Sequence, residues 1–252
     1  MAVLIEIRNL HKSFGSQEVL KGVNLQIEQG KMTVILGVSG CGKSVFLKHI
    51  IGLLKPDEGE VLLEGEDLTK ATEVRMNQIL KRFGMVFQNA ALFDSMTVEE
   101  NAAFPLQEHT RLAPEEIHRI VQEKLRLVGL PKIESKYPSE LSGGMRKRLA
   151  LARALVMDPE IVLYDEPTTG LDPIVSDVIE DLIRETQQRL GHTGIAITHS
   201  LKTCFKLADQ VAMMEDGKII ECTTPEGFRA STDPRVRQFL ASTSKGPIKI
   251  KE

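Results

Sequence analysis

The sequence predicts an α/β fold in which strands and helices alternate along a chain of 252 residues. Stretches that are apolar throughout occur at residues 32–36, 161–164 and 195–198, and such stretches are typical of buried parallel strands. Between them, apolar residues recur with the 3.6-residue spacing of amphipathic helices. The composition, with 42% hydrophobic and 27% charged residues, is that of a globular domain. Together these observations predict a mostly parallel sheet that helices cover on both faces.

The N-terminal region predicts half-buried strands. Val3, Ile5 and Ile7 alternate with residues on the opposite face, and the alternation returns over residues 23–27. A turn at residues 28–31 leads into the first buried strand. The sequence beyond that strand predicts, in order, a glycine-rich loop, a helix over about 44–54, a turn at 56–59, and strands over 61–64 and 83–87.

The middle of the chain, from about residue 89 to residue 157, has a mainly helical pattern. Pro114, followed by two glutamates, marks a helix start, and residues 129–131 mark a helix end. We therefore expect a helical lobe of residues 89–157, inserted into a core formed by residues 1–88 and 158–232.

A long helix and a hairpin are expected after the buried strand at 161–164. Asp216-Gly217, between strands at 211–214 and 218–220, is a strong hairpin signal. The apolar residues of the long helix are expected to share one face: Ile174, Val178, Leu182, Ile183 and Leu190.

A third segment, residues 233–252, is expected to hold a docked helix and a tail. Asp233 suits the N-cap and Pro234 suits the first helical position. The helix is expected to dock on its own subunit or on a neighbouring one, and residues 242–252 are expected to adopt no regular structure. Its apolar face would be formed by Val236, Phe239 and Leu240.

Composition argues against several classes of function. The net charge of −3 and the scarcity of aromatic residues give no basis for binding nucleic acid. The cysteines, Cys41, Cys204 and Cys222, form no metal-ligand pattern and no disulfide framework, so we expect small buried or half-buried residues in a reducing compartment. The N-terminus is no signal peptide and no stretch approaches the ~20 apolar residues of a membrane span. We expect a cytoplasmic protein, whose membrane spans, if it acts at a membrane, come from another chain.

The glycine-rich loop fits the phosphate-binding pattern G-x-x-x-x-G-K-[ST]. Glycines let backbone N–H groups approach phosphate oxygens, and the following helix aims its positive end at them. Lys43 is placed to reach the β- and γ-phosphates of ATP, and the Ser44 hydroxyl is a ligand for Mg²⁺. The Cys41 side chain is assigned no chemistry. The residues expected to bind ATP here are Gly37, Val38, Ser39, Gly40, Cys41, Gly42, Lys43, Ser44 and Val45.

Two carboxylates end the buried strand at residues 161–164. Asp165 and Glu166 would lie at the carboxyl edge of a parallel sheet, where open α/β sheets bind ligands. Asp165 is expected to hold Mg²⁺, and Glu166 to act as the base for the water that attacks the γ-phosphate. A solvated strand end is the commoner cause of such a pair, but the phosphate-binding loop in the same chain favours catalysis.

Leu141-Ser142-Gly143-Gly144-Met145 resembles the signature of ATP-binding-cassette (ABC) ATPases. The resemblance covers about residues 3 to 230 and implies a RecA-like P-loop NTPase core with an N-terminal antiparallel β portion and an inserted helical subdomain. It also implies that Ser142, Gly143 and Gly144 of one copy close over ATP held by Lys43 of another. The other residues that resemble family motifs are Phe14, which would stack on adenine; Gln88, a catalytic residue and Mg²⁺ ligand; Asp172 of the D-loop; and His199, the switch histidine near the γ-phosphate.

Met145 departs from the family, which mostly has glutamine there, and it points to a subgroup. The ATPases of Mla-type (Mce-associated) lipid transporters carry the same methionine followed by basic residues, and residues 88–93, 105–110 and 233–240 are similar to theirs. This resemblance implies a homodimer on the cytoplasmic face of the inner membrane that powers lipid transport. It also implies an integral membrane permease, lipid-binding Mce-type subunits and small regulatory subunits.

Other functions remain open. One is the ATPase of a different importer or exporter, and another is a cytoplasmic assembly ATPase of the same class without a permease. A chromosome-structure or DNA-repair ATPase needs a long coiled coil between the loop and the signature. Only about a hundred residues separate Lys43 from Ser142, and they contain no heptad run.

Two further segments are assigned provisional roles. The basic run of residues 146–148 is expected to be a solvated helix face beside the signature. The apolar residues 90–93 either line a groove for a short helix of the permease or pack locally in the core. The remaining histidines, His192 among them, are expected to be structural.

Overall fold

A computed structural model describes residues 2–249 of the chain. The contacts divide it into two compact units. The first unit comprises the residues up to Ala71 and those from Ile197 onward, and the second unit is Thr72–Ala196.

The first unit contains the antiparallel sheet that the N-terminal pattern predicts. Ile5 and Ile7 are buried on it, whereas Val3, at the strand's start, is 41% exposed. The strand order is β2-β1-β4-β5, with antiparallel pairing throughout. The strands are β1 (Val3–Phe14), β2 (Gln17–Glu28), β4 (Glu58–Leu63) and β5 (Glu66–Asp67).

A second group of strands in the first unit includes the expected buried strand. Every residue of β3 (Met32–Leu36) is buried, and β3 pairs in parallel with β9 (Gln210–Glu215). β9 in turn pairs antiparallel with β10 (Lys218–Thr223). Asp216 and Gly217 join them with φ values of 43° and 75°, the left-handed conformations that a tight hairpin turn needs. The predicted hairpin is therefore confirmed.

The helices of the first unit are short. The helix after the glycine-rich loop ends at Ile50, earlier than the predicted residue 54. Gly52 adopts a left-handed φ of 64° and Leu53 is 63% exposed, so the chain leaves the helix before it can bury another turn. The helices are α1 (Lys43–Ile50), α7 (Leu201–Leu207), α8 (Pro225–Arg229) and α9 (Pro234–Leu240), with a 3₁₀ turn η1 (Leu68–Lys70).

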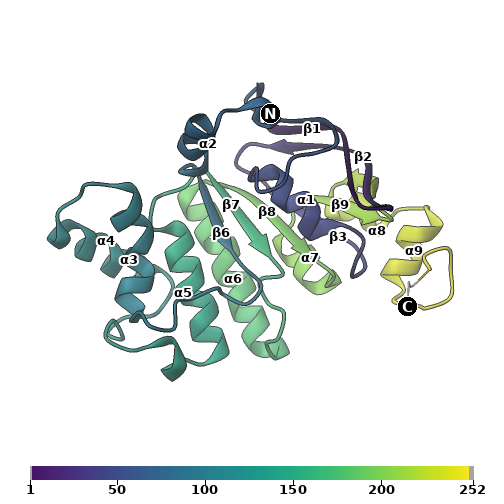
Figure 1. Cartoon of the computed structure of the whole chain (residues 1–252). Helices are drawn as coiled ribbons and strands as arrows, with labels where there is room; N and C mark the ends of the chain where they lie inside the picture. The colour runs from purple at the N-terminus through teal and green to yellow at the C-terminus, as the bar shows by residue number, and fades with distance from the viewer. Residues whose placement is uncertain (1, 250–252) are drawn as a thin grey trace. The chain divides into compact units, whose positions relative to one another are not determined.

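The helix α9 and the segment after it pack against each other (Figure 1). Asp233 caps the helix by accepting from the Arg235 backbone at 2.7 Å, as predicted. Val236 is buried, but Gln238 completes the inner face where Phe239 and Leu240 were expected. The Gln238 amide accepts from the backbone N–H of Ile248 at 2.7 Å and donates to its carbonyl at 3.2 Å. The tail has no helix or strand through residue 249, yet it folds back; residues 250–252 of the predicted tail lie outside the described residues.

The second unit is built on the strands that lead to the acidic pair. β6 (Phe83–Val86) pairs in parallel with β7 (Ile161–Asp165), and Val86 lies opposite Tyr164. β8 (Thr193–Thr198), which begins in this unit, follows β7 in the strand order. A helix α2 (Glu73–Leu80) precedes β6.

Four longer helices complete the second unit. Pro114 begins one of them as predicted, and Gly129, with a φ of 68°, follows its end. Figure 1 shows α3, α4 and α5 gathered beside β6. These helices are α3 (Val98–His109), α4 (Pro114–Leu127), α5 (Gly143–Leu155) and α6 (Pro173–Leu190), and a 3₁₀ turn η2 (Pro138–Glu140) precedes α5.

The predicted apolar face of α6 is wrong in part. Ile174 is 77% exposed, and Val178 and Leu190 are also exposed, whereas Ile179 and Ile183 are buried. The buried stripe continues through polar residues whose hydrogen bonds are satisfied locally. Thr186 donates to the Leu182 carbonyl at 2.8 Å and Gln187 donates to the His192 carbonyl at 3.1 Å.

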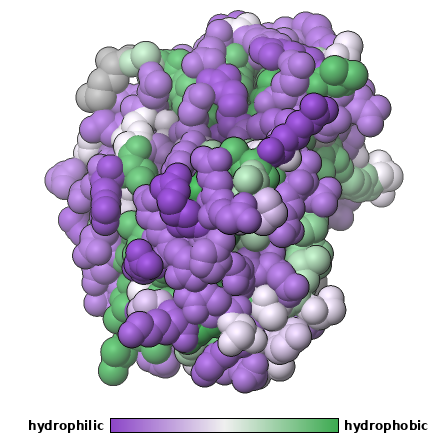
Figure 2. All heavy atoms as spheres, turned by 90° about the vertical axis from the view of Figure 1, so that its left-hand side faces the viewer, coloured by the Kyte–Doolittle hydropathy of each residue, from purple (hydrophilic) through white to green (hydrophobic). Residues whose placement is uncertain are grey.

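The surface over α3 and α4 is mainly hydrophilic, with apolar side chains scattered between polar ones (Figure 2). Within residues 2–249, no helix has both the length and the apolar character that crossing a membrane requires. Cys41 and Cys204 are buried, and Cys222 is exposed, contrary to its predicted burial.

Candidate functional site

The phosphate-binding loop lies between β3 and α1 of the first unit. Gly42 has a φ of 110°, and a Cβ there would lie 3.1 Å from the Val19 carbonyl oxygen, so the position needs glycine. Lys43 is 6% exposed, and its Nζ donates to the carbonyls of Gly37 at 2.8 Å and Val38 at 2.9 Å. The loop thus curls around its own ammonium group, which fixes one positive charge inside it.

The start of α1 leaves its first backbone N–H groups open to a phosphate. Gly42 offers no side-chain cap, and no acidic residue lies in the first turn. These N–H groups have no partner within the helix and carry its positive dipole end. Ser44 is exposed in this turn, while burial raises the pKa of the Cys41 thiol and keeps it neutral. The loop therefore fits an anionic phosphate chain.

Phe14 and His199 both reach the surface of the first unit. Phe14 ends β1 and is 47% exposed, with the Lys12 ammonium 5.7 Å from its ring centroid. This exposure leaves the ring accessible and fits a stacking surface. His199 follows β8 and is exposed directly before Ser200, which caps α7.

The acidic pair ends β7 in the second unit. Asp165 and Glu166 are both half-buried. Glu166 has a φ of 46°, a left-handed conformation that costs a non-glycine residue on the order of 1–3 kcal/mol and that clusters at active sites. Thr169 donates its hydroxyl to Glu166 Oε2 at 3.1 Å and its N–H to the Glu166 carbonyl at 3.2 Å. The side chain and the backbone of Glu166 are thus both fixed.

Gln88 lies at the same edge of the sheet as the acidic pair. It follows β6, whose last residue, Val86, lies opposite Tyr164 in the parallel ladder. Because carboxyl ends of parallel strands share one edge, exposed Gln88 and half-buried Asp165 lie at the same edge of the sheet.

Two cations, Lys147 and Arg153, hold Gln88 and the segment after it, and no motif in the sequence predicts this role. Lys147 donates to the Gln88 carbonyl at 2.5 Å. Arg153 donates to the carbonyls of Ala90 and Ala91, each at 2.8 Å. Both alanines have left-handed φ values, of 61° and 50°, so the guanidinium stabilises a backbone that alanine alone disfavours.

The predicted solvated face at residues 146–148 is therefore wrong for two of its members. Lys147 is 7% exposed, and Arg148 is half-buried and donates to the Val128 carbonyl at 3.1 Å. A signal was available in the sequence. Lys147 shares a helix face with Ala150, Leu151 and Ala154, which lie three, four and seven residues later.

Asn101 of α3 fixes the far end of the same segment. The residue is fully buried, and its amide accepts from the Phe93 N–H at 2.8 Å and donates to the carbonyls of Phe93, Met96 and Thr97 at 3.0 Å each. Phe93 remains 40% exposed and packs on Phe104 with ring centroids 4.8 Å apart. The segment combines a buried end at Ala90 with an exposed aromatic end.

The signature residues begin α5 and contact the start of α6. Ser142 caps α5 by accepting from the Met145 N–H at 3.3 Å. A Cβ on Gly144 would lie 2.8 Å from Val175 Cγ1, which explains the glycine. Asp172 caps α6 by accepting from the Ile174 and Val175 backbones at 3.0 Å each. The structure thus brings the signature and Asp172 to neighbouring helix starts.

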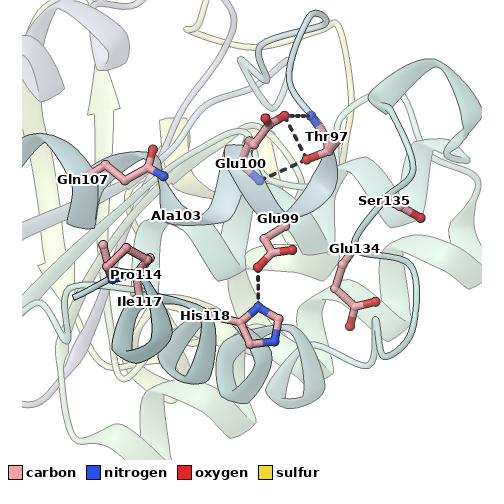
Figure 3. Close-up of a pocket in the computed structure, with 10 residues that line it drawn as sticks. All are labelled: Thr97, Glu99, Glu100, Ala103, Gln107, Pro114, Ile117, His118, Glu134 and Ser135. Carbon is pink, nitrogen blue, oxygen red and sulfur yellow. Dashed lines mark hydrogen bonds and ion pairs between the residues drawn. The ribbon is translucent and has the colours of Figure 1, made fainter. Parts of the chain in front are cut away.

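One hollow lies elsewhere in the second unit. It measures about 660 Å³ and is lined by α3, α4 and residues 134–135 (Figure 3). His118 Nδ1 lies 2.5 Å from Glu99 Oε1 across it, and Glu100 turns away to form a capping box with Thr97. None of the predicted site residues lines this hollow.

Comparisons with known proteins agree with the motifs. Residues 20–169 match the family described as ABC transporter. A Haemophilus influenzae protein, "Intermembrane phospholipid transport system ATP-binding protein MlaF", is 42% identical over 98% of this chain and 94% of its own length. A Mycobacterium leprae protein, "Probable ribonucleotide transport ATP-binding protein mkl", is 44% identical over all of this chain and 73% of its own.

Solved structures agree in fold. CbiO1 of Clostridium perfringens, part of the ABC transporter complex cbiONQ, has a TM-score of 0.84 at 30% identity and covers 92% of this chain and 93% of its own. The ATP-binding cassette MJ0796, a dimer bound to ADP and Pi in a post-hydrolysis state, has a TM-score of 0.80 at 30% identity. The match covers 88% of this chain and 99% of that cassette.

Proposed function

The chain belongs to the ABC transporter family, and from this premise we propose that its ATPase activity powers phospholipid movement through a separate membrane permease. The similarity to the Haemophilus phospholipid transport protein, which spans both chains nearly end to end, carries the proposal. The cassette sits at the cytoplasmic face of the inner membrane. Its partners are a permease, lipid-binding Mce-type subunits and small regulatory subunits.

The phosphate-binding loop and the acidic strand end have different roles in hydrolysis: the loop binds the phosphates, and the strand end activates water. Lys43 and the N–H groups at the start of α1 neutralise the phosphates of ATP. Glu166 accepts the proton of the attacking water, and the left-handed backbone and the Thr169 bonds that hold its carboxylate support this role. His199 contacts the γ-phosphate, and Phe14 stacks on adenine.

The oxygen donors available for Mg²⁺ suit that ion. A hydroxyl from Ser44, a carboxylate from Asp165 and the amide oxygen of Gln88 are hard ligands, and Mg²⁺ takes few protein ligands beside phosphate and water. Within the described residues, no group of three or more His, Cys, Asp or Glu side chains competes as a metal site. Mg²⁺ supplies charge neutralisation at the β- and γ-phosphates when bound.

Two copies of the chain complete the site together. ABC cassettes dimerise, and MJ0796 is a dimer. In the proposed homodimer, Ser142, Gly143, Gly144 and Asp172 of one copy face the ATP held by the other. The start of α5, with no acidic residue in its first turn, would add a second positive helix end to the γ-phosphate.

The cargo can be identified by analysing what the purified complex binds. Isolated with its permease, it should carry bound phospholipid, and cells that lack the chain should show altered outer-membrane lipid distribution and sensitivity to detergent. The Mycobacterium leprae relative is named for ribonucleotide transport, so the extract should also be searched for ribonucleotides. A complex that retains a soluble solute and no lipid would overturn the lipid assignment and leave the ATPase intact.

Phe93→Asp tests contact with the permease. A charge on this exposed ring should lower the ATPase rate of the complex several-fold and leave the isolated cassette unaffected. Val74→Asp is the matched control, because Val74 is 72% exposed in the same unit. Equal rates for both variants in the complex would place the docking site elsewhere.

A further inference from the structure

Lys147 is a buried cation that the nucleotide-binding motifs do not explain. It is 7% exposed on the inner face of α5. Burial lowers the pKa of its ammonium group, and the charges of Asp165 and Glu166 partly offset this effect. Removing an ammonium from water is costly unless hydrogen bonds and opposite charge compensate it. The position therefore requires a strong partner.

The carbonyl of Gln88 is that partner. Lys147 Nζ donates to this carbonyl, and because the donor is charged the hydrogen bond is stronger than a neutral one. Low exposure to water strengthens it further. One bond thus ties α5 to the backbone of the residue that follows β6.

The two ends of this bond lie in two parts of the proposed site. α5 begins at Gly143, directly after Ser142, and Lys147 lies just over one turn into the helix. Gln88 shares the sheet edge with Asp165. Lys147 therefore links the helix that carries the signature to the edge that carries the acids.

The residues after Gln88 make this link stiff. Arg153, also on α5, donates hydrogen bonds to the carbonyls of Ala90 and Ala91, which both have left-handed conformations. The backbone from Gln88 to Ala91 thus has three carbonyls bonded to one helix. A displacement of α5 must displace this backbone with it.

We propose that Lys147 is a positioning residue for ATP hydrolysis, which holds the Gln88 backbone so that the Gln88 amide keeps its placement at the acidic strand end. The inference rests on the proposed role of Gln88. Arg153 fixes the backbone of Ala90 and Ala91. Lys147 fixes the backbone of Gln88, the residue proposed to act in hydrolysis.

Lys147→Met in the full-length chain removes the donor and keeps most of the side-chain volume. We expect kcat to fall roughly 10-fold to 100-fold, the cost of a displaced catalytic group, with the KM for ATP unchanged. Lys147→Arg keeps a charged donor and should restore most of the rate. Arg119→Met, which removes a 69% exposed cation from α4, is the control and should match the wild type.

A double-mutant cycle separates positioning from simple stability. In a Gln88→Ala background the positioned amide is absent, so Lys147→Met should cost little more. Rates are expressed per nucleotide-binding site, which removes any inactive fraction. The inference would be overturned if Lys147→Met lowered kcat by the same factor in the Gln88→Ala background as in the wild type. A wild-type kcat in Lys147→Met would also overturn it.

Two further comparisons keep the result decisive. If Lys147→Met does not fold, Lys147→Gln gives the same test, because its shorter amide does not reach across and keeps a polar group at the site. A wild-type kcat in Gln88→Ala alone would refute the proposed role of Gln88 and the inference with it. A loss in Gln88→Ala without a loss in the Lys147 variants would refute only the inference.

Discussion

Glu166 carries a backbone conformation that glutamate avoids, directly after a buried strand. Glu166→Gln preserves size and hydrogen bonding but cannot take a proton from water. We expect turnover to fall roughly 10²–10⁴-fold while ATP binding persists, measured by phosphate release and nucleotide titration.

Glu160→Gln is the control for this measurement. Glu160 is a 55% exposed carboxylate that pairs with Arg82 just before β7, so its loss should leave turnover unchanged. A hydrolysis rate in Glu166→Gln equal to that of the control would remove Glu166 from the mechanism.

His192 and Tyr164 form a buried pair beneath the acidic strand end, with His192 Nε2 3.0 Å from the Tyr164 hydroxyl. Burial lowers the pKa of His192 from 6.5 to about 4. Well above pH 6.5 the residue is neutral in both folded and unfolded chains. Between pH 6.5 and 4 the unfolded chain binds a proton that the folded chain does not. The free energy of unfolding therefore decreases as the pH is lowered through this range.

The resulting loss is measurable by urea unfolding. Relative to pH 7.5, the His192 contribution at pH 5 should destabilise the fold by about 2 kcal/mol. His192→Gln does not titrate and should lose less stability over the same interval. Parallel pH dependences of the two chains would show that His192 is not the titrating group.

Single residues were predictable where a motif fixes their spacing. Lys43 and Ser44 follow from the loop pattern, and Asp165 and Glu166 from the end of an apolar strand. Lys147 was not predictable as a functional residue, because its partner is a backbone carbonyl 59 residues away, and any residue type supplies a carbonyl. Side chains that act on the backbone leave no matching signal in the partner's sequence.

Elements were predictable where burial is complete or a turn has strict chemistry. The apolar run at β3 and the Asp216-Gly217 turn gave a buried strand and a hairpin. The face of α6 was mispredicted because apolar residues also occupy surfaces, and Ile174 is exposed in the single chain. The inner face of α9 was mispredicted because a polar residue, Gln238, is buried by pairing with the tail.

The α9 segment gives a prediction at the scale of an element. Phe239 and Leu240 stay half-buried in the single chain, so apolar surface remains for a partner. Deleting residues 233–252 should weaken ATP-dependent dimerisation or complex assembly, measured by sedimentation. Arg237→Ala, an exposed change on the same helix, is the control and should assemble normally. Normal assembly of the deleted chain would mean that the segment packs only on its own subunit.

At the scale of the molecule, the order of the motifs predicted the family, and the family fixes the fold. The division of residues into core, lobe and tail stays a prediction. The cargo was predictable only through resemblance, because no apolar site of lipid size can be recognised in the sequence. The face over α3 and α4 is likewise mostly hydrophilic (Figure 2).

The proposed shared site gives the last prediction, because in it each ATP is bound by Lys43 of one chain and Ser142 of the other. Lys43→Ala and Ser142→Arg should each be inactive alone. A heterodimer of the two has one site with both defects and one site with neither. Equal mixing should therefore restore about a quarter of the wild-type ATPase rate if the sites act independently, and less if they are coupled.

Folding must be checked for Ser142→Arg, because Ser142 also caps α5. Loss of that cap should cost on the order of 1 kcal/mol, so a thermal scan should show a folded chain with a lowered midpoint. With both parents folded, activity above their sum can arise only if the two halves of a site come from different chains. A chain that hydrolyses ATP at full rate and stays monomeric in sedimentation would show instead that one copy is sufficient.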